Sequence, residues 1–134
     1  MPDMVSIDRN HTNVAADAAR KAEVLSKAAV RAAAHLDLPN TVLARLLGLS
    51  EASISRLKNG RYDLPPGSKS YELAQLFVRL FRGIDSITGG DDQSSQSWMH
   101  SPNIALRGRP IDLIQTITGL TSAVAYVDSR RARI

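Results

Sequence analysis

Residues 45–61 combine side chains that suit the binding of a polyanion. This stretch contains four cations and a single acid, Glu51. Arginine can bridge guanine, serine and asparagine can reach bases or phosphate, and the other cations suit phosphates. Glu51 would repel phosphate, and Glu51 and Ala52 together leave the start of the helix with little surface that could read bases. The candidate DNA contacts are Arg45, Ser50, Ser53, Ser55, Arg56, Lys58, Asn59 and Arg61.

The segment from residue 40 to residue 58 has the pattern of a helix-turn-helix that would position these side chains. Ala44 is small where two helices must cross, and Gly48 suits a turn with a positive φ. Ser50 can cap the second helix, which would be the recognition helix. The core-facing apolar positions are Leu43, Leu49, Ile54 and Leu57. A helical hairpin that serves only packing or dimerisation fits the same pattern, and this alternative stays open here.

The composition favours helices throughout the chain. Alanine and leucine, both strong helix formers, supply most of the apolar content, and aromatic residues make up only 4%. We therefore predict an all-α protein. We expect a loose tail over residues 1–12 and a helix from Asn13 to near Asp37, where Pro39 follows. Its predicted apolar stripe comprises Val24, Leu25, Ala28, Ala29, Ala32 and Leu36.

Further helices are expected over residues 40–47, 51–59 and 70–82, with Gly83 marking a break. The segment 70–82 is so apolar that it should pack on both halves of the protein. Asp91 and Asp92 could start a helix that leads to Trp98. Pro110 begins another helix, and a break at Thr118-Gly119 precedes a last helix over residues 120–133. These elements predict two domains, residues 13–83 and 84–134.

Catalytic chemistry finds little support in the residue types. The chain has no cysteine, which excludes a disulfide framework, a thiolate metal site and a cysteine nucleophile. His11, His35 and His100 are scattered without metal-ligand spacing. Neither a glycine-rich phosphate loop after a strand nor a nucleophile elbow is present. We expect a protein that is not an enzyme and that holds no cofactor and no metal.

The net charge of +4 is compatible with nucleic-acid binding but is weak evidence by itself. Residues 1–12 are polar and lack the apolar core of a secretory signal. No apolar run approaches the roughly 20 residues that a membrane-spanning helix needs. We expect a soluble, cytoplasmic protein with no membrane partner.

The C-terminal part carries a second pattern. The segment WMHSPNIALRGRP, residues 98–110, combines a lone tryptophan with spaced Pro-Asn, Gly and Pro, and the chain ends in YVDSRRARI. This pattern resembles the toxin-binding domain of the MbcA/ParS/Xre antitoxin family. The segment before it fits the Xre/Cro-like helix-turn-helix domain of the same architecture. Nearly the whole chain is covered by the resemblance.

The resemblance implies an antitoxin that binds a RES-domain toxin, an enzyme that degrades NAD, and occludes its active site. It also implies an antitoxin homodimer within a hetero-oligomer, and binding of operator DNA for autoregulation. The inhibitory element would be the last helix and the end of the chain, because arginine can occupy a pocket built for a phosphate-bearing ligand. The implied toxin contacts are Trp98, Asn103, Arg107, Arg109, Tyr126, Arg130, Arg131, Arg133 and Ile134.

Other interpretations of these residues remain open. Trp98 fits a core position, and Asn103 and Gly108 fit a role in shaping the loop. The terminal arginines also suit the negative end of a helix exposed to solvent. A stand-alone dimeric helix-turn-helix repressor, whose C-terminal helices serve only dimerisation, is the alternative function.

Overall fold

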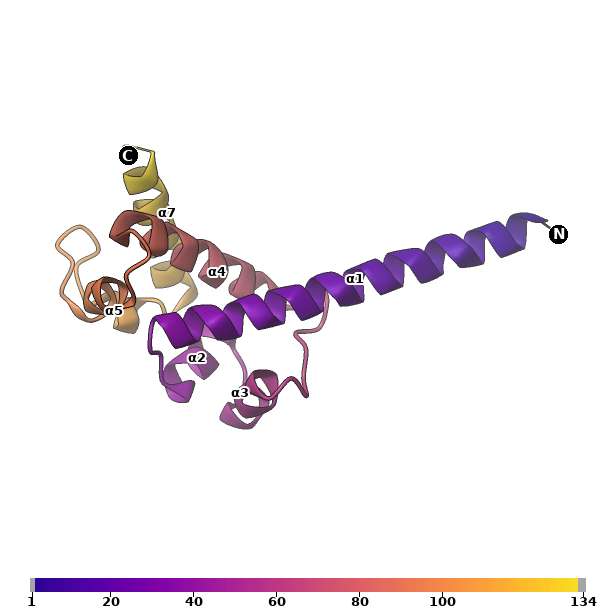
Figure 1. Cartoon of the computed structure of the whole chain (residues 1–134), viewed down its shortest axis with the longest axis horizontal. Coiled ribbons are helices and arrows are strands. Elements are labelled where there is room, and N and C mark those ends of the chain that lie inside the picture. Colours follow the sequence, from indigo (N-terminus) through magenta and orange to yellow (C-terminus); the bar gives the residue numbers. More distant parts are fainter. Residues whose placement is uncertain (1, 133–134) are drawn as a thin grey trace.

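The computed structural model describes residues 2–132, with side chains described from residue 13 onward, and in this range the regular elements are all helices. The all-α fold class is therefore confirmed. Figure 1 shows their arrangement: α2 and α3 lie on one side of the long α1, and α4 and α7 lie on the other. The bounds are α1 Pro2–His35, α2 Asn40–Leu47, α3 Glu51–Lys58, α4 Lys69–Thr88, α5 Asp92–His100, α6 Pro110–Leu113 and α7 Ile117–Arg131.

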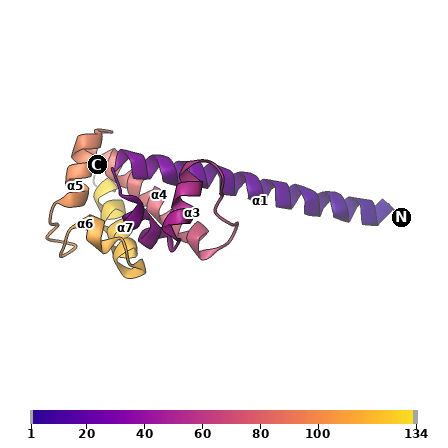
Figure 2. The same cartoon turned by 90° about the horizontal axis from the view of Figure 1, so that it is seen from below.

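Helix α1 begins earlier than the sequence suggested. It starts at Pro2, so the loose tail expected over residues 1–12 is wrong for residues 2–12. Proline is tolerated at the first position of a helix, and neither glycine nor proline interrupts the chain between Asp3 and Leu38. The N-terminal part of α1 extends beyond the other helices, as Figures 1 and 2 show. The predicted stripe is mostly covered, but Val24 is 63% exposed.

Helices α2 and α3 form the predicted helix-turn-helix. Gly48 lies between them with φ 67°, which glycine adopts without strain. The Ser50 hydroxyl accepts a hydrogen bond from the Ser53 backbone N–H at 3.1 Å and so caps α3. Ile54 and Leu57 are the buried residues of α3. The turn, the cap and the apolar positions therefore agree with the sequence pattern.

Helix α4 continues through the position where we expected it to end. It runs to Thr88, and Gly83 lies buried inside it. A Cβ atom on Gly83 would lie 2.0 Å from Val127 Cγ1 of α7, so the glycine permits a close crossing of the two helices. The expected break at Gly83 is therefore wrong. The true end is at Gly89, which has φ 69°.

The C-terminal helices confirm some boundaries and correct others. The Asp91 carboxylate accepts from the Ser94 backbone N–H at 2.9 Å, which caps α5 and lowers the pKa of Asp91 through hydrogen bonds from the Ser94 side chain and backbone. Helix α6 begins at Pro110, as expected. Helix α7 begins at Ile117, so the expected break at Thr118-Gly119 is wrong. Gly119 packs in the first turn, where a Cβ atom would lie 1.8 Å from the Leu113 carbonyl oxygen.

One continuous core joins the two halves of the chain. Helix α4 contacts α1 and α2 of the first half of the chain and α5 and α7 of the second half, which confirms that it packs on both halves. The core includes Leu36 and Leu47 from the first half, Phe77 from α4, and Leu120 and Val127 from α7. Helix α4 is consequently shared by the two halves.

We predict that Gly83→Ala destabilises the protein. Helix propensity alone would favour alanine by about 1 kcal/mol, but overpacking against buried Val127 costs about 1–3 kcal/mol. Urea denaturation of the variant measures the free energy of unfolding. The double variant Gly83→Ala/Val127→Ala is the control, because it removes the clashing methyl groups and should lose less stability than the two single changes combined. Increased stability of Gly83→Ala alone would contradict the close crossing.

Candidate functional site

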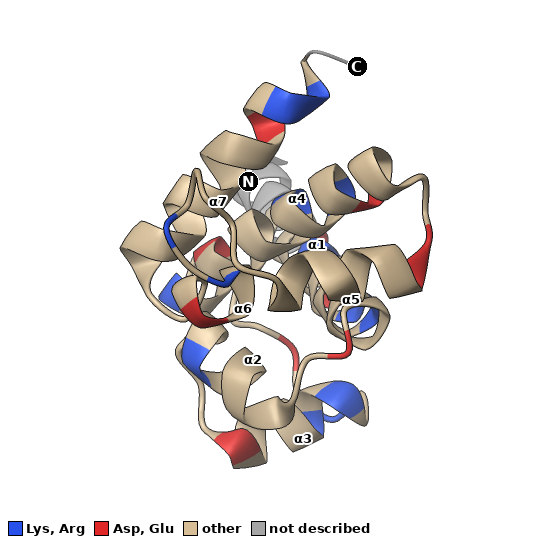
Figure 3. Ribbon diagram, turned by 90° about the vertical axis from the view of Figure 1, so that its left-hand side faces the viewer, with Lys and Arg blue, Asp and Glu red and all other residues tan. Residues whose placement is uncertain are grey.

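The outward face of α3 is exposed and contains most of the residues predicted to bind DNA. Ser55, Arg56, Lys58 and Asn59 are all exposed along this helix. Arg61 follows closely, and its backbone N–H donates to the Arg56 carbonyl at 2.8 Å. Figure 3 shows Lys and Arg on α3, with an acidic residue near its start. This face offers cations to phosphates and short polar side chains to bases.

A short hydrogen-bonded chain orders the start of this face. The Ser50 hydroxyl donates to Ser53 Oγ at 3.0 Å, and Arg56 Nη2 donates to the same atom at 3.2 Å. Ser53 therefore aligns the Arg56 guanidinium along the helix surface. Ser50 is occupied by its role as the cap of α3, which leaves less of its hydrogen-bonding capacity for a ligand.

Two of the residues predicted to bind DNA make hydrogen bonds outside the Ser50–Ser53–Arg56 series. Lys58 Nζ donates to the Asn40 side-chain oxygen, which ties the end of α3 to the start of α2. Arg45 Nη1 donates to Gln115 Oε1 at 3.4 Å, and Gln115 lies between α6 and α7. Arg45 thus touches the C-terminal half and lies on α2 rather than on the α3 face.

The loop before α6 is built around Asn103. The Asn103 side-chain oxygen accepts from the Leu106 N–H at 3.0 Å, and its backbone N–H donates to the Gly108 carbonyl at 2.9 Å. Arg107 takes a positive φ of 64° to complete the turn. Asn103 thus holds the loop through its side chain and its backbone, as the loop-shaping interpretation expects. At the same loop, Ile104 is 97% exposed, and sequence reasoning missed it.

The other residues predicted to contact a toxin occupy three different environments. Trp98 is half-buried against the core. Arg109 is exposed and forms a bidentate pair with Asp112, at 2.9 and 3.2 Å. Arg130 lies over the Tyr126 ring and donates to its hydroxyl at 2.9 Å, so these two side chains form one unit on α7. Arg131 is also exposed in the last turn of α7.

The structure does not gather these residues into one patch. Figure 1 shows the loop before α6 beside α5, whereas the C-terminal end of α7 projects from another part of the molecule. Arg133 and Ile134, predicted to be part of the inhibitory end, lie outside the described residues. The end of α7 and the loop are therefore separate candidate contacts.

The described residues offer neither a cluster of metal ligands nor a membrane-spanning helix. Within residues 13–132, no group of three or more His, Asp or Glu side chains is arranged to hold a metal ion. None of the described helices is both long enough and apolar enough to cross a membrane.

Two protein-family models match this chain, one in each half. The model of the antitoxin Xre-like helix-turn-helix domain matches residues 15–79, which contain α2 and α3. The model of the antitoxin Xre/MbcA/ParS C-terminal toxin-binding domain matches residues 85–133, which contain α5 to α7. The chain belongs to the Xre/MbcA/ParS antitoxin family. No curated protein matches its sequence. In this antitoxin, α3 belongs to the helix-turn-helix match, and the Asn103 loop and the end of α7 belong to the toxin-binding match.

We predict that Asn103→Ala loosens the loop of this antitoxin. The variant loses the side-chain oxygen that accepts from the Leu106 N–H, and a hydrogen bond worth about 1 kcal/mol corresponds to roughly fivefold faster exchange of that amide. Amide hydrogen exchange measures the effect. Asn103→Asp keeps an oxygen at this position and should retain the protection. Equal exchange in wild type and Asn103→Ala would show that the side chain does not hold the loop.

Proposed function

We propose that this antitoxin binds and inhibits a RES-domain, NAD-degrading toxin by occluding its active site. The observation that carries the proposal is the match of residues 85–133 to a toxin-binding domain, combined with the exposed arginines at the end of α7. A guanidinium makes paired, charge-assisted hydrogen bonds to phosphate-like groups, so it suits a cleft built for a dinucleotide. The protein is proposed to act as a binding protein in the cytoplasm rather than as an enzyme.

The proposed plug is the last turn of α7 with the residues that follow it. Arg130 is held by the Tyr126 hydroxyl and ring, which fixes its direction before the toxin binds. Arg131 is also exposed in the same turn. Preorganised side chains lose less conformational entropy on binding, which favours affinity. Arg133 and Ile134 are proposed as further toxin contacts, together with Arg107, Arg109, Asn103 and Trp98.

The second part of the proposal is autoregulation through operator DNA. The α3 face presents Arg56, Lys58 and Asn59, and the adjacent Arg61 extends the cationic surface. Arg45, Ser50, Ser53 and Ser55 are proposed as additional contacts. Helix-turn-helix proteins commonly bind as dimers to paired half-sites, so a homodimer within a hetero-oligomer suits this role. The match to a toxin-binding domain favours this combination over a stand-alone repressor.

We predict that deleting residues 130–134 abolishes neutralisation. Cells that express the cognate RES-domain toxin should grow with the intact chain and arrest with the shortened chain, because the proposed plug is missing. The deletion removes only the end of α7 and residues beyond it, so the helical circular dichroism should remain. Ser129→Ala, an exposed change in the same helix, is the control and should still rescue growth. Full rescue by the shortened chain would contradict the plug.

For the DNA contact, we predict opposite effects from two charge changes on α3. Arg56→Ala should weaken operator binding by about tenfold, because it removes a guanidinium from the exposed face. Glu51→Gln should strengthen binding, because it removes a carboxylate that repels phosphate. Fluorescence anisotropy at a fixed salt concentration measures both. If neither variant differs from wild type, α3 does not face the operator.

A further inference from the structure

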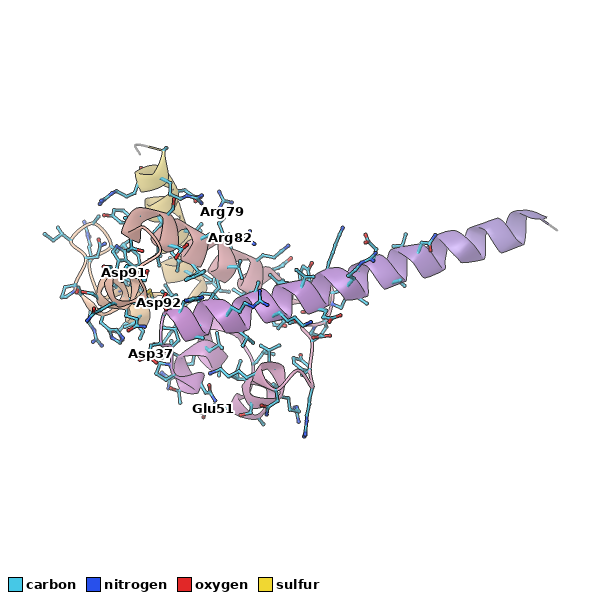
Figure 4. All side chains as sticks on the ribbon, viewed as in Figure 1. Asp37, Glu51, Arg79, Arg82, Asp91 and Asp92 are labelled. Carbon is cyan, nitrogen blue, oxygen red and sulfur yellow. The ribbon has the colours of Figure 1, made fainter. Side chains whose placement is uncertain are left out.

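A groove of about 630 Å³ lies between α1, α4 and the end of α7, and of its lining residues the proposed function uses only Arg131. Its charged lining contains no acid: the cations are Arg20, Lys21, Arg79, Arg82 and Arg131. Figure 4 places Arg79 and Arg82 on the side of the molecule opposite Glu51 of α3. The groove is therefore remote from the proposed DNA surface.

Only part of this charge is balanced by the chain itself. Asp17 lies 3.2 Å from Arg20 and 3.4 Å from Lys21, and the hydrogen bond from Arg20, helped by Lys21, lowers the pKa of Asp17. Asp128 lies 2.6 Å from Arg79. Among the described residues, Arg82 and Arg131 have no carboxylate within 4.0 Å. The unbalanced charge is consequently concentrated where α4 meets the end of α7.

The groove also has an apolar surface. Val24, Leu25, Ala28 and Val78 contribute to its lining, and Val24 is 63% exposed. A phosphate backbone gains little from such a surface, whereas a protein segment with carboxylates beside apolar side chains complements both features. The chemistry therefore favours a protein segment over nucleic acid.

We propose that this groove docks an acidic, amphipathic segment of the toxin, with a carboxylate at Arg82 and apolar side chains over Val24 and Leu25. The proposal rests on the proposed function, because Arg131 belongs to the toxin-binding match and makes the groove continuous with that surface. Docking here would hold the toxin against the antitoxin beside the plug. The helix-turn-helix half, through α1 and α4, would thus contribute to toxin affinity.

The test measures the affinity of the purified full-length chain for its purified cognate RES-domain toxin. Arg82→Glu should weaken binding by about tenfold or more, and Arg82→Ala by a smaller factor. Val24→Asp should also weaken binding, because it places a charge on the apolar surface. Arg31→Glu is the matched control: it reverses an exposed cation of α1 outside the groove and should leave toxin affinity unchanged. Circular dichroism melting checks that each variant folds.

Three results would overturn the proposal, and they have different meanings. If wild type binds the toxin and the Arg82 and Val24 variants bind as tightly as Arg31→Glu, the groove is not a docking site while the proposed function stands. If wild type does not bind the toxin, both the proposed function and the groove proposal fail. If Arg82→Glu weakens operator binding but leaves toxin binding intact, the groove serves nucleic acid instead.

Discussion

The close crossing of α4 and α7 is the contact on which the rest of the structure depends. Gly83 lets Val127 approach so closely that a Cβ atom at this position would clash, and the two helices share one core as a result. Helix α4 also packs on α1 and α2, which hold α3 in place. The helix-turn-helix and the toxin-binding surface are therefore parts of one packed body, in which α3 and the end of α7 point to different sides (Figure 1).

Local chemistry explains why some of the fold could be predicted from the sequence. A helix cap or a turn with positive φ depends on neighbouring residues, so Gly48, Ser50 and Pro110 marked the correct boundaries. The predicted helix breaks at Gly83 and Gly119 are wrong because a single sequence does not distinguish a glycine that ends a helix from one that permits close packing. Only the approach of Val127 and of the Leu113 carbonyl distinguishes them.

In the candidate sites, too, features that depend on neighbouring residues could be predicted, and features that depend on tertiary packing could not. The exposed face of α3 follows from helical periodicity once its cap is known, so its outward side chains could be predicted. Val24 belongs to the predicted apolar stripe, but its exposure could not be predicted, because it depends on how far α4 covers α1. Ile104 and the groove at Arg82 depend likewise on loop geometry and on helices brought together from distant parts of the chain.

We propose that the antitoxin uses separate surfaces for its toxin and for its operator. Hydrogen–deuterium exchange of the full-length chain, measured once with the toxin and once with operator DNA, tests this most directly. The account predicts that the toxin slows exchange at the end of α7 and along the groove, whereas DNA slows exchange in α3 and the residues that follow it. Slower exchange in α3 with the toxin, and none at the end of α7, would contradict the account.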